Sequence, residues 1–166
     1  GLFDQLGGGF HRYCVDAALT IPHFEKMLYD QGQLLRSFAE TARRAGADEG
    51  DLLWPVRETV AYLRREMAAP DGGFFASQDA DSEGAEGKFF VWTPGEIIEV
   101  LGEEDGRIFN ETYNVTADGN FEGKSIPNLE FGSGRPEAVS DEKFSAMRKK
   151  LFGAREQRIK PFRDEK

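Results

Sequence analysis

The sequence predicts a mainly α-helical fold of stacked helical hairpins, with a short β-hairpin inserted. Apolar residues recur at helical spacing over residues 21–45, and a second apolar stripe follows over about residues 48–68. The short link between them, at Gly46, predicts an antiparallel helical hairpin. Gly8-Gly9-Phe10 recurs as Gly72-Gly73-Phe74 on the far side of this hairpin. A repeated loop and hairpin is typical of a solenoid, a helical bundle or a closed toroid.

The middle of the chain carries the β signals. Pro70-Asp71-Gly72-Gly73 predicts a turn, because these residue types favour turn conformations. The stretches 74–77 and 88–92 flank the acidic loop DADSEGAEG and are expected to pair as the inserted β-hairpin.

The second half of the chain returns to helical signals. Thr93-Pro94-Gly95-Glu96 has the pattern of a capping box and predicts the start of a short helix. Residues 104–113 are expected to be helical and residues 117–135 irregular. Ser140 is expected to cap a last helix that runs to about residue 156.

Composition restricts the classes of partner and compartment. The chain has 166 residues, with 30 Asp and Glu against 21 Lys and Arg, and a net charge of −9. Such a surface repels phosphate backbones, so a nucleic-acid partner is disfavoured. No stretch approaches the roughly 20 apolar residues that a membrane span needs. The single cysteine, Cys14, rules out an internal disulfide and fits the cytoplasm. Gly1 in place of an initiator Met, and a charged C-terminal end, indicate that residues 1–166 are a fragment of a longer protein.

His23, Lys26 and Asp30 form the first group of candidate site residues. Helical spacing would bring them onto one face, at the edge of the apolar stripe. Half-buried groups of this kind pair with each other and titrate near neutrality, which suits acid–base chemistry. The alternative is a capping histidine beside an ordinary Lys–Asp pair.

A glycine-rich corner supplies the second group. Gly7-Gly8-Gly9 precedes Phe10-His11-Arg12-Tyr13. Glycines allow the backbone to approach a ligand closely, Arg binds carboxylates or hydroxyls, and Tyr can stack on a sugar ring. The spacing matches neither of the glycine-rich phosphate-binding motifs. The alternative is a tight turn with solvated side chains.

The acidic loop supplies the third group. Asp79, Asp81 and Glu83 imitate the first half of a calcium loop, but Phe90 stands where a bidentate Glu belongs. Calcium is therefore an alternative that this mismatch weakens. Paired carboxylates could instead act as general acid and general base, and a solvated surface loop is the remaining interpretation.

Several blocks together resemble the spermatogenesis-associated thioredoxin-like (YyaL-type) protein family. These blocks are GLFDQLGGGFHRYCVD, PHFEKMLYDQ, GGFFASQDADSEGAEGKFFVWTPGEI, Tyr113-Asn114-Val115 with Gly119-Asn120-Phe121-Glu122-Gly123, and AREQRIKPFRDEK. The resemblance extends in order over nearly the whole chain. It implies a fragment of an (α/α)6 toroid of the six-hairpin glycosidase and N-acylglucosamine 2-epimerase type, which in this family follows a thioredoxin-like domain. Sugar chemistry is inferred from the toroid alone.

The resemblance also implies which polar positions line the mouth of the toroid. They are His11, Arg12, Asp16, His23, Glu25, Lys26, Asp30, Asp79, Asp81, Glu83, Lys88 and Trp92. The sequence departs from the family pattern at Cys14, where a hydroxyl residue is common, and at Ser125 and Pro127. These departures concern the middle loop more than the mouth.

Together these observations predict a carbohydrate-active domain without a cofactor, either a glycoside hydrolase or a sugar epimerase or isomerase. Asp79, Asp81 and His23 are the expected catalytic groups, and the other mouth residues, with Tyr13, are expected to bind the sugar. The alternative, from another class, is a non-catalytic toroid that serves as a binding or scaffolding module for the thioredoxin-like redox domain.

Overall fold

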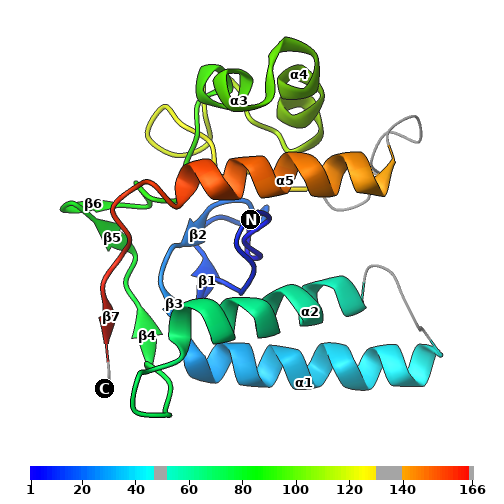
Figure 1. The fold of residues 1–166 in the computed structure, drawn as a ribbon, viewed down its shortest axis with the longest axis vertical. Helices are drawn as coiled ribbons and strands as arrows, with labels where there is room; N and C mark the ends of the chain where they lie inside the picture. The colour runs from blue at the N-terminus through cyan, green and yellow to red at the C-terminus, as the bar shows by residue number, and fades with distance from the viewer. Residues whose placement is uncertain (47–51, 130–139, 165–166) are drawn as a thin grey trace.

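The computed structural model describes residues 1–46, 52–129 and 140–164. Helices α1 (Leu28–Ala45) and α2 (Leu53–Tyr62) lie side by side on one side of the molecule, and α5 (Asp141–Arg155) lies on the other (Figure 1). The N-terminal segment lies between these two helical layers, and most of the short strands lie along the left side of the view. Helices α3 (Pro94–Leu101) and α4 (Glu103–Thr112) pack beyond α5. The fold is thus mixed helix and strand, and the toroid remains a prediction.

The first predicted helix is shorter than expected. It ends as predicted, with Gly46 in the left-handed conformation at φ 66°. It begins only at Leu28, because residues 22–27 are extended and form β2 (Pro22–His23) and β3 (Lys26–Met27). The prediction that the helix starts at residue 21 is therefore wrong. The backbone N–H and C=O groups of this stretch form hydrogen bonds with other segments of the chain. For example, Arg12 N–H donates to the Glu25 carbonyl at 2.8 Å.

The second helix of the hairpin is confirmed over the part that the structure describes. Helix α2 continues without a break into the π-helical turn η1 (Leu63–Met67). It lies against α1 in Figure 1, and the two run antiparallel. The predicted start at residue 48 and the link before it lie outside the described residues. The predicted turn at residues 70–73 is present, with Gly72 N–H donating to the Ala69 carbonyl at 3.1 Å.

The strands pair differently from the prediction. Strand β4 (Ser77–Gln78) lies between β3 and β7 (Arg163–Asp164), and β1 (Tyr13–Cys14) pairs with β2, all antiparallel. The inserted hairpin consists instead of β5 (Asp81–Ser82) and β6 (Ala85–Glu86). Its two loop residues, Glu83 and Gly84, have φ of 54° and 75°, which is the turn geometry that suits a two-residue hairpin. The expected pairing of residues 74–77 with 88–92 is therefore wrong.

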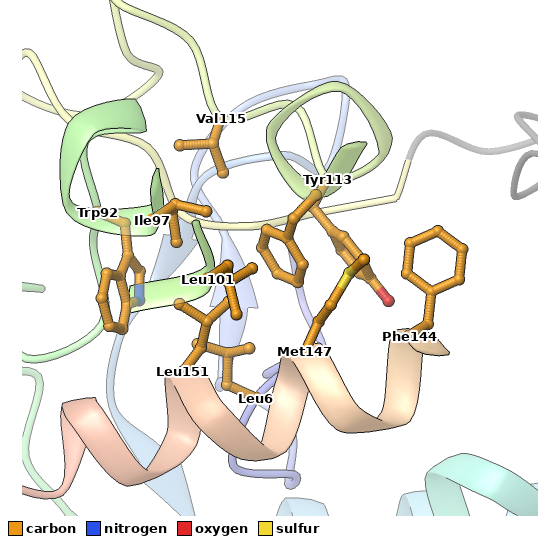
Figure 2. Packing of buried hydrophobic residues seen from close by; sticks show 10 residues of the cluster. Leu6, Trp92, Ile97, Leu101, Tyr113, Val115, Phe144, Met147 and Leu151 are labelled. Atoms are coloured by element: carbon orange, nitrogen blue, oxygen red, sulfur yellow. The ribbon is translucent and has the colours of Figure 1, made fainter. Parts of the chain in front are cut away.

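The predicted elements of the second half are confirmed. Thr93 caps α3 through a complete capping box, α4 begins one residue early, and Ser140 caps α5. Residues 117–129 are irregular, as expected, and residues 130–135 lie outside the described part. Met147 and Leu151 of α5 pack with Ile97 and Leu101 of α3 in one core, and Phe144 extends this core beside Tyr113 (Figure 2). Within the described ranges, no helix has the length and apolar character to span a membrane.

The capping box gives a testable stability increment. The Glu96 N–H donates to Thr93 Oγ1 at 3.2 Å, and the Thr93 N–H donates to Glu96 Oε2 at 2.7 Å. Thr93→Ala is therefore expected to lower the free energy of unfolding by about 1 kcal/mol in urea denaturation. Thr116→Ala, at an exposed threonine outside the helices, is the matched control and should leave stability unchanged. Equal losses in both variants would contradict the assignment.

Candidate functional site

The extended conformation of residues 22–27 sorts the predicted site residues onto two faces. Side chains alternate along an extended segment, so Phe24 and Lys26 point inward and are fully buried, whereas His23 and Glu25 point outward. The prediction that His23 and Lys26 share one helical face is therefore wrong. Asp30 lies separately, in the first turn of α1.

The outward side chains form a connected group, here called the outer-face cluster: Arg12, Tyr13, His23, Glu25 and Glu86. His23 Nδ1 lies 2.8 Å from Glu86 Oε1, and Nε2 lies 3.7 Å from Glu25 Oε2. Arg12 donates to the same Glu25 oxygen at 3.0 Å. The Tyr13 ring lies 5.1 Å from the His23 ring and is 49% exposed. The cluster thus offers an imidazole between two carboxylates, a guanidinium and an exposed aromatic face.

Glu86 belongs to this cluster although it was not a predicted site residue. The tight turn of the β5–β6 hairpin places it opposite Asp81, and its side chain reaches His23. The structure therefore brings Asp81 next to the cluster, on the neighbouring strand. The acidic run around residues 79–86 indicated carboxylate chemistry, but only the local hairpin shows which carboxylate reaches the histidine.

Two other predicted residues, Asp16 and Trp92, have clear structural contacts, whereas Asp30 has one carboxylate oxygen without a partner among the described residues. The Asp16 carboxylate accepts the N–H groups of Thr20 and Ile21, at 3.0 and 2.7 Å, and so closes a loop. Trp92 is buried in the core against α5, with the Arg158 guanidinium 4.0 Å above its ring. Burial raises the pKa of Asp30, and its Oδ2 has no partner among the described residues.

The acidic residues of the loop make separate contacts. Glu83 pairs with Lys88 at 3.0 Å on the exposed side of the β5–β6 hairpin. Asp79 is held through its backbone N–H, which donates to the Phe162 carbonyl at 2.8 Å. Among the residues that the structure describes, no group of three or more His, Cys, Asp or Glu side chains is arranged to hold a metal ion.

Behind the outer face lies a buried ionic cluster of Asp4, Lys26 and Arg155. Lys26 Nζ donates to Asp4 Oδ2 at 2.8 Å, and Arg155 donates to both Asp4 oxygens at 2.9 Å. Lys26 Nζ also lies 4.4 Å from the centre of the Tyr62 ring, a cation–π contact. The cluster therefore joins the first residues of the chain to β3 and to the end of α5.

Burial and charge together set the ionisation of this cluster. Burial opposes the charge on Asp4, but Arg155 and Lys26 outweigh it and hold the pKa of Asp4 well below its usual value. Burial lowers the pKa of Lys26 to about 8, although Asp4 acts in the opposite direction. Sequence reasoning identified Lys26 but neither Asp4 nor Arg155, because these residues are far apart in the chain: Arg155 is 151 residues from Asp4.

His11 lies beside this buried cluster and not on the outer face. Its Nδ1 lies 2.9 Å from the Phe24 carbonyl, and its ring packs edge-on against Phe24 and Phe90. A carbonyl can only accept, so Nδ1 carries the proton of the neutral ring. Burial, reinforced by the charge of Lys26, lowers the pKa of His11 to about 3. His11 is thus a neutral, fully buried residue that supports the strand carrying His23 and Glu25.

Comparison with known proteins indicates the relatives of the chain, although no family model matches it. It is 32% identical to spermatogenesis-associated protein 20 of Homo sapiens over 201 aligned positions, which cover all of this chain and 25% of that protein. It is 34% identical to the Mus musculus protein of the same name, over 78% of this chain and 18% of that protein. An uncharacterized Caenorhabditis elegans protein is 34% identical, covering 78% of this chain and 20% of its own length. The chain thus spans a quarter or less of these relatives, and identities of 32–38% support its kinship with the spermatogenesis-associated protein 20 family.

Proposed function

We propose that the outer-face cluster binds a carbohydrate and serves, in the longer proteins, as part of a sugar epimerase, isomerase or glycoside hydrolase. The observation that carries this proposal is the His23 imidazole between Glu86 and Glu25, beside the exposed Tyr13 ring. Groups that move protons and an aromatic face that stacks on a sugar ring are thereby combined on one surface.

The arrangement of His23 favours proton transfer. Glu86 orients the ring through Nδ1, which leaves Nε2 free to exchange a proton. Nε2 then faces the side of Glu25, where a substrate proton could be taken up or returned. A histidine base suits epimerases and isomerases, which remove a proton next to a carbonyl group. Asp81, opposite Glu86, and Asp79, two residues earlier, are the proposed further acid–base groups, as a hydrolase would need two carboxyl groups.

The architecture belongs to the same proposal. We place the chain in an (α/α)6 toroid next to a thioredoxin-like domain, in the cytoplasm, as the family resemblance implies. The relatives are long enough to contain these further parts, since this chain covers only 18–25% of the two spermatogenesis-associated proteins compared above. In that setting Arg12, fixed by Glu25, offers its remaining donors to sugar hydroxyls.

Titration of the chain with a panel of mono- and disaccharides, followed by NMR, tests the binding step. A binding sugar is expected to shift the Tyr13 and His23 signals, and Tyr13→Ala is expected to weaken it about tenfold. Phe74→Ala is the matched control, because Phe74 is similarly exposed, at 51%, but lies outside the cluster. Equal weakening by both variants would contradict the assignment. In the full-length protein, His23→Gln should lower turnover of a responsive sugar about 10²–10⁴-fold.

The alternative function is a non-catalytic module that holds the thioredoxin-like domain. The same titration distinguishes the two functions. If no sugar shifts any NMR signal and the isolated thioredoxin-like domain binds to this chain, the scaffold function is favoured. In that case the outer-face cluster would serve to fix the loops at the interface.

A further inference from the structure

The structure also has a cleft, here called the second cleft because it is a second candidate site. It lies apart from the outer-face cluster and shares no residue with it. It has a volume of about 640 Å³ and lies between η1, β4 and the C-terminal segment 160–164. Its lining residues are Glu66, Phe75, Gln78, Lys160, Pro161, Phe162, Arg163 and Asp164. This volume falls within the usual range for small-molecule sites, and the walls combine two aromatic rings with a few charged groups.

Arg163 is held at this cleft in a fixed orientation. One of its Nη1 hydrogens is donated to the Glu66 carbonyl at 2.8 Å. Its guanidinium lies 4.8 Å from the centre of the Phe75 ring, which supports the planar group from one side. No other hydrogen bond of this guanidinium is formed with the described residues, so most of its donors remain available.

The other charges of the cleft are compensated or negative. Lys160 donates to both Glu66 oxygens at 3.0 Å and also pairs with Glu156 at 2.7 Å. Arg65 adds a further contact to Glu66 at 3.0 Å. Asp164 lines the cleft as a carboxylate with interactions of its own. The one available guanidinium matches the single charge of a carboxylate, whereas a doubly charged phosphate would find no second unpaired cation among the described lining residues.

The interior of the cleft is polar at one point. Gln78 is buried, and its Oε1 accepts the Tyr62 hydroxyl proton at 3.0 Å, which fixes the amide. Phe162, 70% exposed, and Pro161 add apolar surface beside it. We propose that this cleft binds a ring-containing small molecule through one carboxylate, which forms a bidentate pair with Arg163 while the ring lies against Phe75 and Phe162. A sugar acid has this chemistry.

An NMR titration of the 166-residue chain with glucuronate tests the proposal, with neutral glucose as the probe that lacks the carboxylate. Glucuronate is expected to shift the signals of Phe75, Gln78 and Arg163, and glucose is expected not to shift them. Arg163→Gln should raise the Kd for glucuronate at least about tenfold, since hydrogen bonds to charged groups contribute this much. Arg36→Gln is the matched control, because it removes one exposed positive charge from α1 and should leave the Kd unchanged.

Three results would overturn the proposal: no shift with glucuronate, equal shifts with glucose, or the same Kd in Arg163→Gln as in the original chain. Inorganic phosphate that binds as tightly as glucuronate would also overturn the carboxylate assignment. If Arg163→Gln disturbs the fold, Phe162→Ala replaces it, because this exposed ring supports no core and its loss should still weaken glucuronate binding. All readouts come from the second cleft, so failure here is separate from failure of the outer-face proposal.

Discussion

Replacing Asp4 by alanine is expected to lower the free energy of unfolding by about 3–5 kcal/mol, as removal of one partner from a buried ion pair does. Asp4 accepts hydrogen bonds from Lys26, from both terminal nitrogens of Arg155, and from the N–H groups of Leu6 and Gly7. Alanine would leave two buried cations facing each other without a counter-charge. It would also leave buried N–H groups without a partner.

Urea denaturation of Asp4→Ala against the original chain measures this effect. Glu40→Ala is the control: it removes an acidic partner of an arginine too, but the Arg36–Glu40 pair is exposed, and less than about 0.5 kcal/mol is expected. Asp4→Asn keeps the shape and loses only the charge, so its loss should lie between the two. A loss below about 1 kcal/mol in Asp4→Ala would show that the buried pair contributes little beyond its own burial cost.

The parts of the fold that depend on neighbouring residues could be predicted from the sequence. The Thr93 capping box and the left-handed Gly46 are decided within a few residues, and both are confirmed. The start of α1 was not decidable in this way. Residues 22–27 have apolar spacing that fits a helix, but their backbone groups pair with Arg12, Tyr13 and Gln78, far away in the chain. Long-range pairing overrode the local pattern here.

Long-range contacts also limit how much of the candidate site can be predicted from the sequence. The sequence predicts Arg12, Tyr13, His23 and Glu25 as site residues, and the structure brings their side chains together. Glu86 was missed because its contact with His23 requires a local hairpin where the sequence suggested a wider one. His11 and Lys26 were expected near a substrate. Their side chains are buried instead. Alternation along residues 22–27 directs Lys26 inward, and His11 packs against the rings of Phe24 and Phe90.

Acidification is expected to destabilise the chain well above the pH at which its carboxylates titrate, and His11 is the cause. Its folded-state pKa is about 3, against 6.5 for an unperturbed histidine, because burial disfavours the charged ring. Between these values the unfolded state binds one more proton than the folded state. Stability therefore falls as pH falls from 6.5 toward 3, by about 1.4 kcal/mol per pH unit.

Urea denaturation at pH 6.5 and at pH 5 should therefore give free energies of unfolding that differ by about 2 kcal/mol. Asp4 and other carboxylates with lowered pKa values contribute only at lower pH, where the unfolded carboxylates take up protons. His11→Gln should abolish the difference between the two pH values. Thr116→Ala, which removes no titratable group, is the control and should keep this difference.

A slope that survives in His11→Gln would show that another group titrates in this range and that His11 is not held neutral. If the pH dependence of the free energy of unfolding disappears in His11→Gln, the result also concerns the geometry of the outer-face cluster. His11 bonds the carbonyl of Phe24, which lies between His23 and Glu25 in the same extended segment. A proton on the second nitrogen of His11 would place a charge beside Lys26 and loosen this segment. The His23 geometry of the outer-face cluster therefore depends on a neutral His11 beneath it, and the proposed sugar binding is expected to fail in acid together with the fold.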